Sequence, residues 1–316
     1  MKAMILAAGF GTRLWPLTED RNKPAIPFLN RPLISYSVEY LVSFGLSDII
    51  INLHHQPECI REALGDGSRF GASIHYSYEE EILGTSGAMD RVRDQLAEDD
   101  FIVINGKIVT DIDLHAAISE HRERNAIATL VLKPNTARER FSRVEIDERG
   151  FITRFAGFPT DDESEPLMFT GIQVLSPRIF EYIPRGRFSH STTDVYPRAI
   201  EAGEAVIAHI SKGDWYEMST LDRYLEASII FMRKRGMSVV TGAGSVIEEG
   251  ARVRDSVLWE NVHVERGADI YRSVIAAGVR IPSGAYINDA IVARRDRVRQ
   301  VERGEVVGEN IIVPLR

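Results

Sequence analysis

A glycine-containing loop near the N-terminus carries two cations that could bind an anion. The stretch AMILAAG predicts a buried strand, and Gly9 and Gly11 lie in the turn that follows it. Backbone N–H groups in such a turn can surround phosphate oxygens. Arg13 adds a guanidinium that can bind an oxyanion through two hydrogen bonds, and Lys23 adds a mobile point charge. This pattern favours an anionic ligand over a plain structural turn.

A second group of charged residues follows the strand pattern FIVING. The strand stops at Asn105-Gly106, and Lys107, Asp111 and Asp113 come next. Proteins with alternating strands and helices usually place ligands at the carboxyl ends of their strands. The two aspartates could ligate a metal, although aspartate is also common in turns and helix caps, and we favour a cap for Asp113.

Alternating strand and helix patterns over residues 1–235 must position these side chains. Strands are expected at 3–9, 48–54, 72–78, 101–106, 126–134, 145–155 and 169–177. Helices are expected at 32–45, 57–67, 85–96, 114–125 and 221–236. Such alternation predicts an α/β domain with a Rossmann-like, mainly parallel sheet that is covered by helices on both faces.

After Gly236 the pattern changes to a repeat. Segments 248–264, 265–281 and 282–298 superpose without a gap, with a glycine in register in each. Three apolar columns also agree: Val253, Ile270 and Ile287; Leu258, Ile275 and Val292; Val264, Ile281 and Val298. Apolar residues five or six positions apart predict three short strands per coil, so residues 236–316 are expected to form a small parallel β-helix of hexapeptide-type repeats.

Composition limits the classes of partner. The 316 residues carry a net charge of −8, which argues against a nucleic-acid or anionic-membrane partner, and no apolar run reaches the roughly 18 residues of a membrane span. The basic run ARRDRVRQ at 293–300 is expected to be a solvated face of the third coil. Cys59 is the single cysteine, so no intramolecular disulfide is possible. We expect a cytoplasmic protein.

Two enzyme classes are disfavoured by single positions. The pattern Gly-x-Gly-x-x-Gly of dinucleotide-binding oxidoreductases fails because Leu14 stands at the third glycine. An acyltransferase that acts through the coils would need a base, and His263 is the only histidine in them. The β-helix is better interpreted as an oligomerisation or regulatory surface.

The motifs resemble those of the sugar-1-phosphate nucleotidylyltransferases, which make NDP-sugars. MILAAGFGTRLWPLT followed by KP resembles the family signature, and EILGTSGA, IVING, FTGIQVLSP, DVYPRAI and WYEMSTLDRYLEA follow in the family's order. NLHH together with EILGTSG looks most like the mannose-1-phosphate guanylyltransferases and related NDP-sugar synthases. Several branches also carry a C-terminal β-helix, which the resemblance implies to be left-handed here.

The resemblance implies a role for each matching residue. The NTP would be bound by Leu6, Ala8, Gly9, Gly11, Thr12 and Arg13, and its base by Gly84, Thr85 and Gly87. Lys23 would steady the α-phosphate and the leaving pyrophosphate, and the sugar 1-phosphate would meet Glu145, Thr170 and Gly171. The implied reaction is in-line attack of a sugar-phosphate oxygen on the α-phosphorus, with Mg²⁺ offsetting the repulsion between the two anions.

Three positions depart from the family pattern. Lys107 stands where Asn-Gly-Asp supplies a metal-ligating aspartate, and Glu217 stands for the aspartate of Trp-x-Asp-x-Gly-Thr. The segment FAGFP at 155–159 replaces a Glu-Lys-Pro whose lysine holds the sugar phosphate in many members. A protonated lysine cannot ligate a metal, so ordinary Mg²⁺ binding is in doubt, with Glu217 and Asp111 as the remaining candidate ligands.

Several interpretations of Lys107 stay open. It could replace the metal as a cation that pairs with the phosphates or with Glu217, and with Arg13 and Lys23 it would then be catalytic. It could instead mark a regulatory homologue that binds nucleotide or NDP-sugar without turnover, or be an artificial substitution, or be a solvated side chain without a role. The leading hypothesis is a homo-oligomeric nucleotidyltransferase that assembles through the β-helix or the sheet domain, with GTP and mannose 1-phosphate as the best guess for its substrates.

Overall fold

A computed structural model describes residues 1–137, 139–155 and 166–315. The chain forms two compact units, which are described separately below. Unit 1 comprises Met1–Gly9, Tyr36–Pro57 and Leu64–Trp215, and unit 2 comprises Phe10–Ser35, Glu58–Ala63 and Tyr216–Arg316. Both units are discontinuous in sequence, and the boundary expected after residue 235 stays a prediction. Among the described residues, no helix combines the length and the apolar character needed to cross a bilayer.

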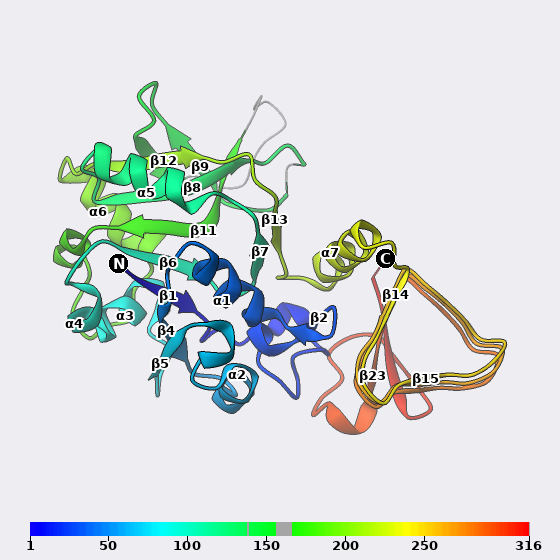
Figure 1. The fold of residues 1–316 in the computed structure, drawn as a ribbon. Helices are drawn as coiled ribbons and strands as arrows, with labels where there is room; N and C mark the ends of the chain where they lie inside the picture. Colours follow the sequence, from blue (N-terminus) through cyan, green and yellow to red (C-terminus); the bar gives the residue numbers. More distant parts are fainter. Residues whose placement is uncertain (138, 156–165, 316) are drawn as a thin grey trace. The chain divides into compact units, whose positions relative to one another are not determined.

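Unit 1 is built on a mixed nine-stranded sheet (Figure 1). The strands β6, β1, β4 and β5 lie side by side and are parallel: Phe101–Asn105, Lys2–Leu6, Asp48–Leu53 and Ser73–Tyr78. Next to β6 lies the antiparallel β11 (Leu167–Leu175), which also pairs with β8 (Ala128–Pro134) and β9 (Arg143–Ile146). β12 (Val206–Ile210) pairs with β8, and β10 (Ile152–Phe155) with β9. The α/β prediction is confirmed, and β11 makes the sheet mixed.

Apolar residues are buried on both faces of the central strands. Met4, Ile50 and Val103 belong to a core cluster that includes residues of α3 (Gly84–Arg91), α4 (Arg93–Leu96) and α6 (Tyr196–Glu201). Ile5 and Ile49 point to the opposite face, because successive strand side chains alternate, and they are fully buried as well. The other helices are α1 (Leu33–Ser43), α2 (Pro57–Leu64), α5 (Leu114–Glu123) and, in unit 2, α7 (Leu221–Lys234). Central strands buried on both faces require helices on both faces.

Unit 2 contains a parallel β-helix in which short strands repeat along three sheets. The first sheet contains β14 (Val239–Thr241), β17 (Ser256–Leu258), β20 (Val274–Ile275) and β23 (Ala290–Arg294). The second contains β15 (Val246–Ile247), β18 (His263–Val264) and β21 (Arg280–Ile281). The third contains β16 (Arg252–Arg254), β19 (Asp269–Tyr271) and β22 (Tyr286–Asn288). The expected coils are therefore present.

The pairing follows the apolar columns until the last coil. Val253 pairs with Ile270, which pairs with Ile287, and the column from Leu258 to Val292 pairs in the same way. In the third column Val264 pairs with Ile281, but Val298 follows a 3-10 helix at Arg295–Arg297 and lies in no strand. The chain instead turns back as an antiparallel hairpin, β24 (Glu305–Val307) and β25 (Asn310–Pro314), that pairs with β23 and ends the first sheet.

Residues 10–35 pack with the β-helix in unit 2. This segment includes the short hairpin β2 (Pro27–Phe28) and β3 (Arg31–Pro32). The Tyr224 hydroxyl on α7 donates a hydrogen bond to the Pro27 carbonyl and accepts one of 3.1 Å from the indole N–H of the buried Trp259. The side-chain amide of Asn30 donates to the Leu258 carbonyl at 3.1 Å. Most of the N-terminal loop thus belongs to the compact unit that holds the C-terminal repeats.

Candidate functional site

Three neighbouring strands of unit 1 bring candidate residues together at one edge of the sheet. Leu6 ends β1 and pairs with Asn105, which ends β6. The next residue, Gly106, donates its backbone N–H to the Leu6 carbonyl at 3.0 Å, and the half-buried Lys107 follows. On the other side of β6, a Cβ added to Gly171 of β11 would lie 2.0 Å from the amide nitrogen of Asn105. The structure therefore gathers Leu6, Lys107 and Gly171 around Asn105, whose role the sequence did not indicate.

An irregularity in β11 shapes this edge. The register between β11 and β8 shifts between Phe169 and Gln173, and Gly171 has a φ of +81°. The Thr170 hydroxyl donates to the Val131 carbonyl at 2.7 Å, and the Thr170 carbonyl accepts from the indole of Trp215 at 3.0 Å. The threonine side chain is thus used inside the fold. Bulges of this kind often redirect the backbone next to functional sites. Here the bulge places the backbone of Gly171 at the edge of the sheet beside Asn105.

A buried hydrogen-bond chain connects the ends of β1, β4 and β5 to the start of α3. The backbone N–H of Ala7 donates to the Asn52 side chain at 2.7 Å, and the Asn52 amide donates to the Glu79 carboxylate at 2.7 Å. The other oxygen of Glu79 accepts from the backbone N–H of Leu83 at 2.9 Å. Asn52 is 3% exposed and Glu79 is 1% exposed. The sequence signal for these two residues is a polar side chain at the end of an apolar strand, Asn52 in β4 and Glu79 after β5.

The expected base-pocket residues pack closely against a neighbouring segment. A Cβ on Gly84 would lie 2.3 Å from the Ser189 carbonyl oxygen, and one on Gly87 would lie 2.6 Å from that of Arg187. The Thr85 hydroxyl accepts a hydrogen bond of 2.8 Å from the backbone N–H of Ser191. These contacts explain the small residues by close backbone approach. A role in binding the base stays a prediction.

Glu145 is held by two arginines. It lies on β9, which is separated from β6 by β11 in the sheet order. Arg154 approaches its carboxylate at 2.7 Å and Arg143 at 2.6 Å. The hydrogen bond from Arg154, together with the charges of both arginines, lowers the pKa of Glu145 below its ordinary value. Its acceptors are therefore already engaged, and its contact with a sugar stays a prediction.

The candidate residues in unit 2 lie in a tightly folded turn. Gly11 has a φ of +71°, and its carbonyl accepts from the backbone N–H of Leu14 at 2.9 Å. A Cβ on Gly11 would lie 2.7 Å from the Cβ of Lys23, so only glycine fits there without displacement. Lys23 is buried, whereas Thr12 and Arg13 are exposed in the short 3-10 helix Thr12–Leu14. Exposed Gly9, in unit 1, has nothing within 4 Å of such a Cβ.

The carboxylates expected to bind a metal are engaged elsewhere. Glu217 is buried, and its carboxylate accepts from the Arg223 guanidinium at 3.1 Å. Asp111 accepts from the backbone N–H of Asp214 at 2.6 Å, and Asp113 caps α5 as expected.

No cluster of three or more His, Cys, Asp or Glu side chains among residues 1–137, 139–155 and 166–315 could hold a metal ion. These residues therefore do not fit the divalent cation that the family resemblance implies. Of the third departure, positions 156–159 lie outside the described residues.

Two family models match successive parts of the chain. Residues 2–233 match the model described as nucleotidyl transferase. Residues 230–312 match the model described as GlmU-like, C-terminal hexapeptide. Together they cover the unit 1 sheet and the repeats of unit 2.

Individual relatives support the same assignment. The chain is 32% identical over 280 residues to a UTP–glucose-1-phosphate uridylyltransferase of Synechocystis, a match that covers 84% of this chain and 72% of the relative. It is 28% identical over 290 residues to a mannose-1-phosphate guanylyltransferase of Mycobacterium tuberculosis, covering 83% and 80%. The crystal structure of HddC from Yersinia pseudotuberculosis superposes with a TM-score of 0.64 at 23% identity, covering 73% of this chain and 99% of that one, and supports the fold alone.

Proposed function

The chain belongs to the nucleotidyl transferase family, and on that premise we propose that it transfers a guanylyl group from GTP to mannose 1-phosphate and releases pyrophosphate. The relatives are named as enzymes that transfer a nucleotidyl group to a sugar 1-phosphate. The choice of GTP and mannose 1-phosphate as the two substrates is the more specific part of the proposal. Their support is the pair of motifs NLHH and EILGTSG together with the guanylyltransferase relative. UTP and glucose 1-phosphate are the first competing pair, because the uridylyltransferase is 32% identical.

The observation that carries the proposal is the edge of the sheet where Leu6, Lys107 and Gly171 meet around Asn105. An oxygen of the sugar phosphate attacks the α-phosphorus in line, and pyrophosphate leaves without a covalent enzyme intermediate. Catalysis of this kind consists of positioning and charge neutralisation. Backbone at Leu6 and Gly171 would orient the nucleotide and the sugar, and Lys107 would supply positive charge at the strand end.

The cations of the chain would neutralise the two anions. Lys23 would steady the α-phosphate and the leaving pyrophosphate, and Arg13 would bind phosphate oxygens through its guanidinium fork. Because Glu217 and Asp111 are held by other partners, we assign the protein's own share of the neutralisation to Arg13, Lys23 and Lys107.

A pyrophosphate-release assay tests the proposal. Purified protein is given GTP, UTP, dTTP, ATP or CTP with mannose 1-phosphate or glucose 1-phosphate, in the presence of Mg²⁺. We expect release with GTP and mannose 1-phosphate to exceed every other pair. Higher release with UTP and glucose 1-phosphate would replace the substrate assignment, and no release with any pair would refute the enzyme activity.

One set of contacts favours a second candidate, a regulatory homologue that binds nucleotide without turnover. Lys107 follows the strand end, and Glu217 is bound by Arg223 instead of being presented to a ligand. Such a protein would bind GTP in a calorimeter and release no pyrophosphate. Turnover that appears in the double variant Lys107→Asp with Glu217→Asp would then identify the metal site as the missing part.

A further inference from the structure

The C-terminal end of the β-helix contacts the loop that carries Arg13. We call residues 295–315 the cap and residues 12–20 the arginine loop; both belong to unit 2. Arg303 of the cap donates from one guanidinium nitrogen to the Trp15 carbonyl at 2.9 Å and to the Arg13 carbonyl at 3.4 Å. The backbone N–H of Arg299 donates to the Glu19 carboxylate at 3.1 Å. The cap therefore holds the loop at two places along its length.

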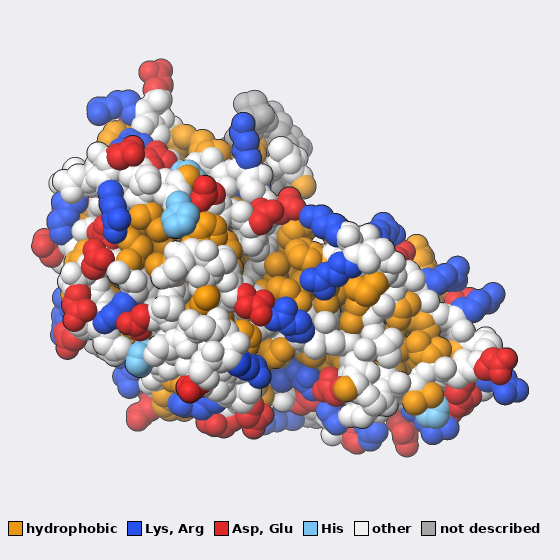
Figure 2. All heavy atoms as spheres, viewed as in Figure 1, with side chains coloured by type: hydrophobic (Ala, Val, Ile, Leu, Met, Phe, Trp, Pro, Cys, Tyr) orange, Lys and Arg blue, Asp and Glu red, His pale blue; other side chains and the backbone are white. Residues whose placement is uncertain are grey.

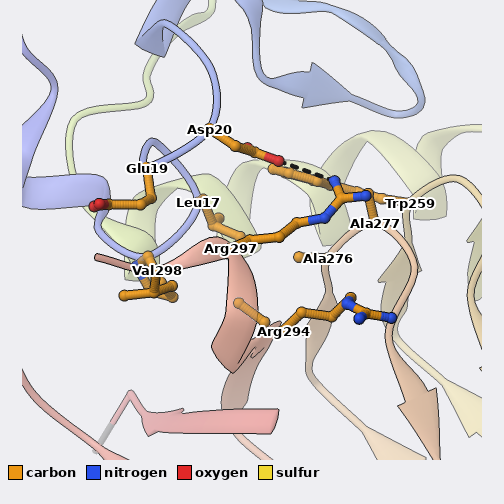
Figure 3. A pocket seen from close by; sticks show the side chains of 11 residues that line it. Leu17, Glu19, Asp20, Trp259, Ala276, Ala277, Arg294, Arg297 and Val298 are labelled. Atoms are coloured by element: carbon orange, nitrogen blue, oxygen red, sulfur yellow. Dashed lines mark hydrogen bonds and ion pairs between the residues drawn. The ribbon is translucent and has the colours of Figure 1, made fainter. Parts of the chain in front are cut away.

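A third contact also connects the cap to the arginine loop. The guanidinium of Arg297 lies 3.0 Å from the Asp20 carboxylate, and both residues line a small pocket together with Leu17 and Val298 (Figure 3). Arg21, which follows the loop, pairs with Glu260 at 3.1 Å. The loop is thus held by cap residues that lie 277 to 290 positions away in the sequence, and Arg303 reaches the backbone carbonyl of Arg13.

Arg13 and Arg303 also border one cavity. Its volume is about 230 Å³, and its lining residues are Arg13, Thr220, Leu221, Asp222, Arg303, Pro314 and Leu315. The Arg13 side chain is exposed, so its direction depends on the backbone from which it extends. That backbone is the part that Arg303 holds. Replacing Arg303 would keep the Arg13 side chain but would remove the hydrogen bond to the Arg13 carbonyl.

We infer that Arg303 is a positioning residue for nucleotide binding, because it fixes the Arg13 backbone so that the Arg13 guanidinium is directed at the triphosphate. This inference rests on the proposed function, in which Arg13 binds NTP phosphates. Both bonds come from one guanidinium nitrogen, whose two N–H groups are fixed in the plane of the group, whereas lysine carries its donors on a rotatable ammonium. A loop that is ordered before binding loses less conformational entropy when the ligand arrives, so its order increases affinity.

The test measures GTP binding to full-length protein by calorimetry, without sugar phosphate, for wild type, Arg303→Ala, Arg303→Lys and Arg13→Ala. We expect Arg303→Ala to raise the Kd for GTP about tenfold, the effect of losing one charge-assisted hydrogen bond. Arg303→Lys should recover part of this loss, and Arg303→Ala added to Arg13→Ala should cost little more. The matched control is Arg266→Ala, an exposed β-helix arginine whose backbone N–H, which the substitution keeps, donates to the Glu248 carboxylate at 3.0 Å.

Steady-state kinetics separate a positioning role from loss of folded protein. Misfolding would lower kcat and leave both KM values unchanged, whereas the inference expects a raised KM for GTP and an unchanged KM for the sugar phosphate. A Kd for GTP within twofold of wild type in Arg303→Ala would overturn the inference even if the enzyme turns over. Weakened GTP binding in a protein without turnover would uphold it and refute the proposed function. Absence of GTP binding to wild type would overturn both.

Discussion

The buried pair Asn52–Glu79 offers a sharp test of how unit 1 holds its loops. The Asn52 side chain accepts from Ala7 and donates to Glu79, each at 2.7 Å, and Glu79 also holds the backbone N–H of Leu83. Replacing Asn52 by aspartate keeps the shape and the acceptor for Ala7. It also places a second carboxylate against Glu79 with no amide hydrogen between them. Two carboxylates at that distance cannot both be ionised in a buried site, so the folded variant must hold a shared proton.

The free energy needed to keep that proton bound determines how much stability Asn52→Asp loses. The folded variant binds one proton more than its unfolded chain, whose carboxyl groups have pKa values of about 4. Stability therefore falls by about 1.4 kcal/mol for each pH unit above 4, until the pH passes the raised pKa of the pair. Relative to wild type, Asn52→Asp should lose about 1.4 kcal/mol at pH 5 and about 4 kcal/mol at pH 7, if the pair keeps its proton to that pH. The penalty is smallest in acid and grows as pH rises.

Asn52→Leu separates lost hydrogen bonds from added charge. It leaves the Ala7 N–H and one oxygen of Glu79 buried without their partner, at about 1–3 kcal/mol for each group and more for the charged one. We therefore expect a loss of roughly 3–5 kcal/mol at pH 7, which is compared with the loss in Asn52→Asp at the same pH. Asn288→Asp is the control, because Asn288 is exposed on β22 and the chemical change is the same.

Urea unfolding followed by circular dichroism, at half-unit steps from pH 5 to 8, measures all three variants. A pH-independent difference between Asn52→Asp and wild type would refute the shared proton. A loss below about 1 kcal/mol in Asn52→Leu would refute the claim that the chain of hydrogen bonds holds the Ala7 and Leu83 loops.

Three further changes have definite expected outcomes. Gly11→Ala should cost about 1–3 kcal/mol and weaken GTP binding in calorimetry, because φ is +71° and the new methyl would lie 2.7 Å from the Cβ of Lys23; unchanged stability would contradict this. Gly171→Ala should displace the Asn105 amide and raise the KM for the sugar phosphate more than that for GTP, and an equal rise in both would count against the placement at the sugar. Burial lowers the pKa of His121, so wild-type stability should fall as pH drops below about 6.5 toward the lowered folded value. Thermal melting of His121→Gln between pH 7.5 and 5 should show a smaller fall, and an identical slope would exclude His121 as its source.

Local patterns predicted the long helices and the stacking of the coils. They did not predict β12, and the strand expected at 145–155 is two antiparallel strands, β9 and β10. The helix that begins at Leu33 ends before Gly45, whose φ of +77° suits the end of a helix. In the β-helix, residues in one column pair directly, as Val253 does with Ile270. Both results follow from the spacing of apolar residues, which can be recognised within a short segment of sequence. The handedness of the coils does not follow from periodicity and stays an expectation from the family resemblance.

Long-range partners could not be predicted in this way. The mixed sheet depends on β11 returning antiparallel beside β6, and no local pattern encodes strand direction. The basic run at 293–300 was expected to be a solvated face; its arginines are exposed at 295, 297 and 299, yet Arg297 and Arg299 also contact Asp20 and Glu19. The sequence around an exposed arginine does not show whether a carboxylate from a distant segment pairs with it.

Lys107 changes the way in which charge can be supplied at the strand end. An aspartate with a bound divalent cation carries a net charge of +1, which is also the charge of a lysine, so the exchange conserves charge. It does not conserve geometry, because an ammonium lacks the fixed octahedral arrangement of oxygen ligands that Mg²⁺ imposes on phosphates. Under the proposed function, positioning of the substrates would then rest on the backbone at Leu6 and Gly171. Contacts that fix this backbone, such as that of Asn52 with the Ala7 N–H, should therefore affect the reaction although Asn52 is not proposed to touch a substrate.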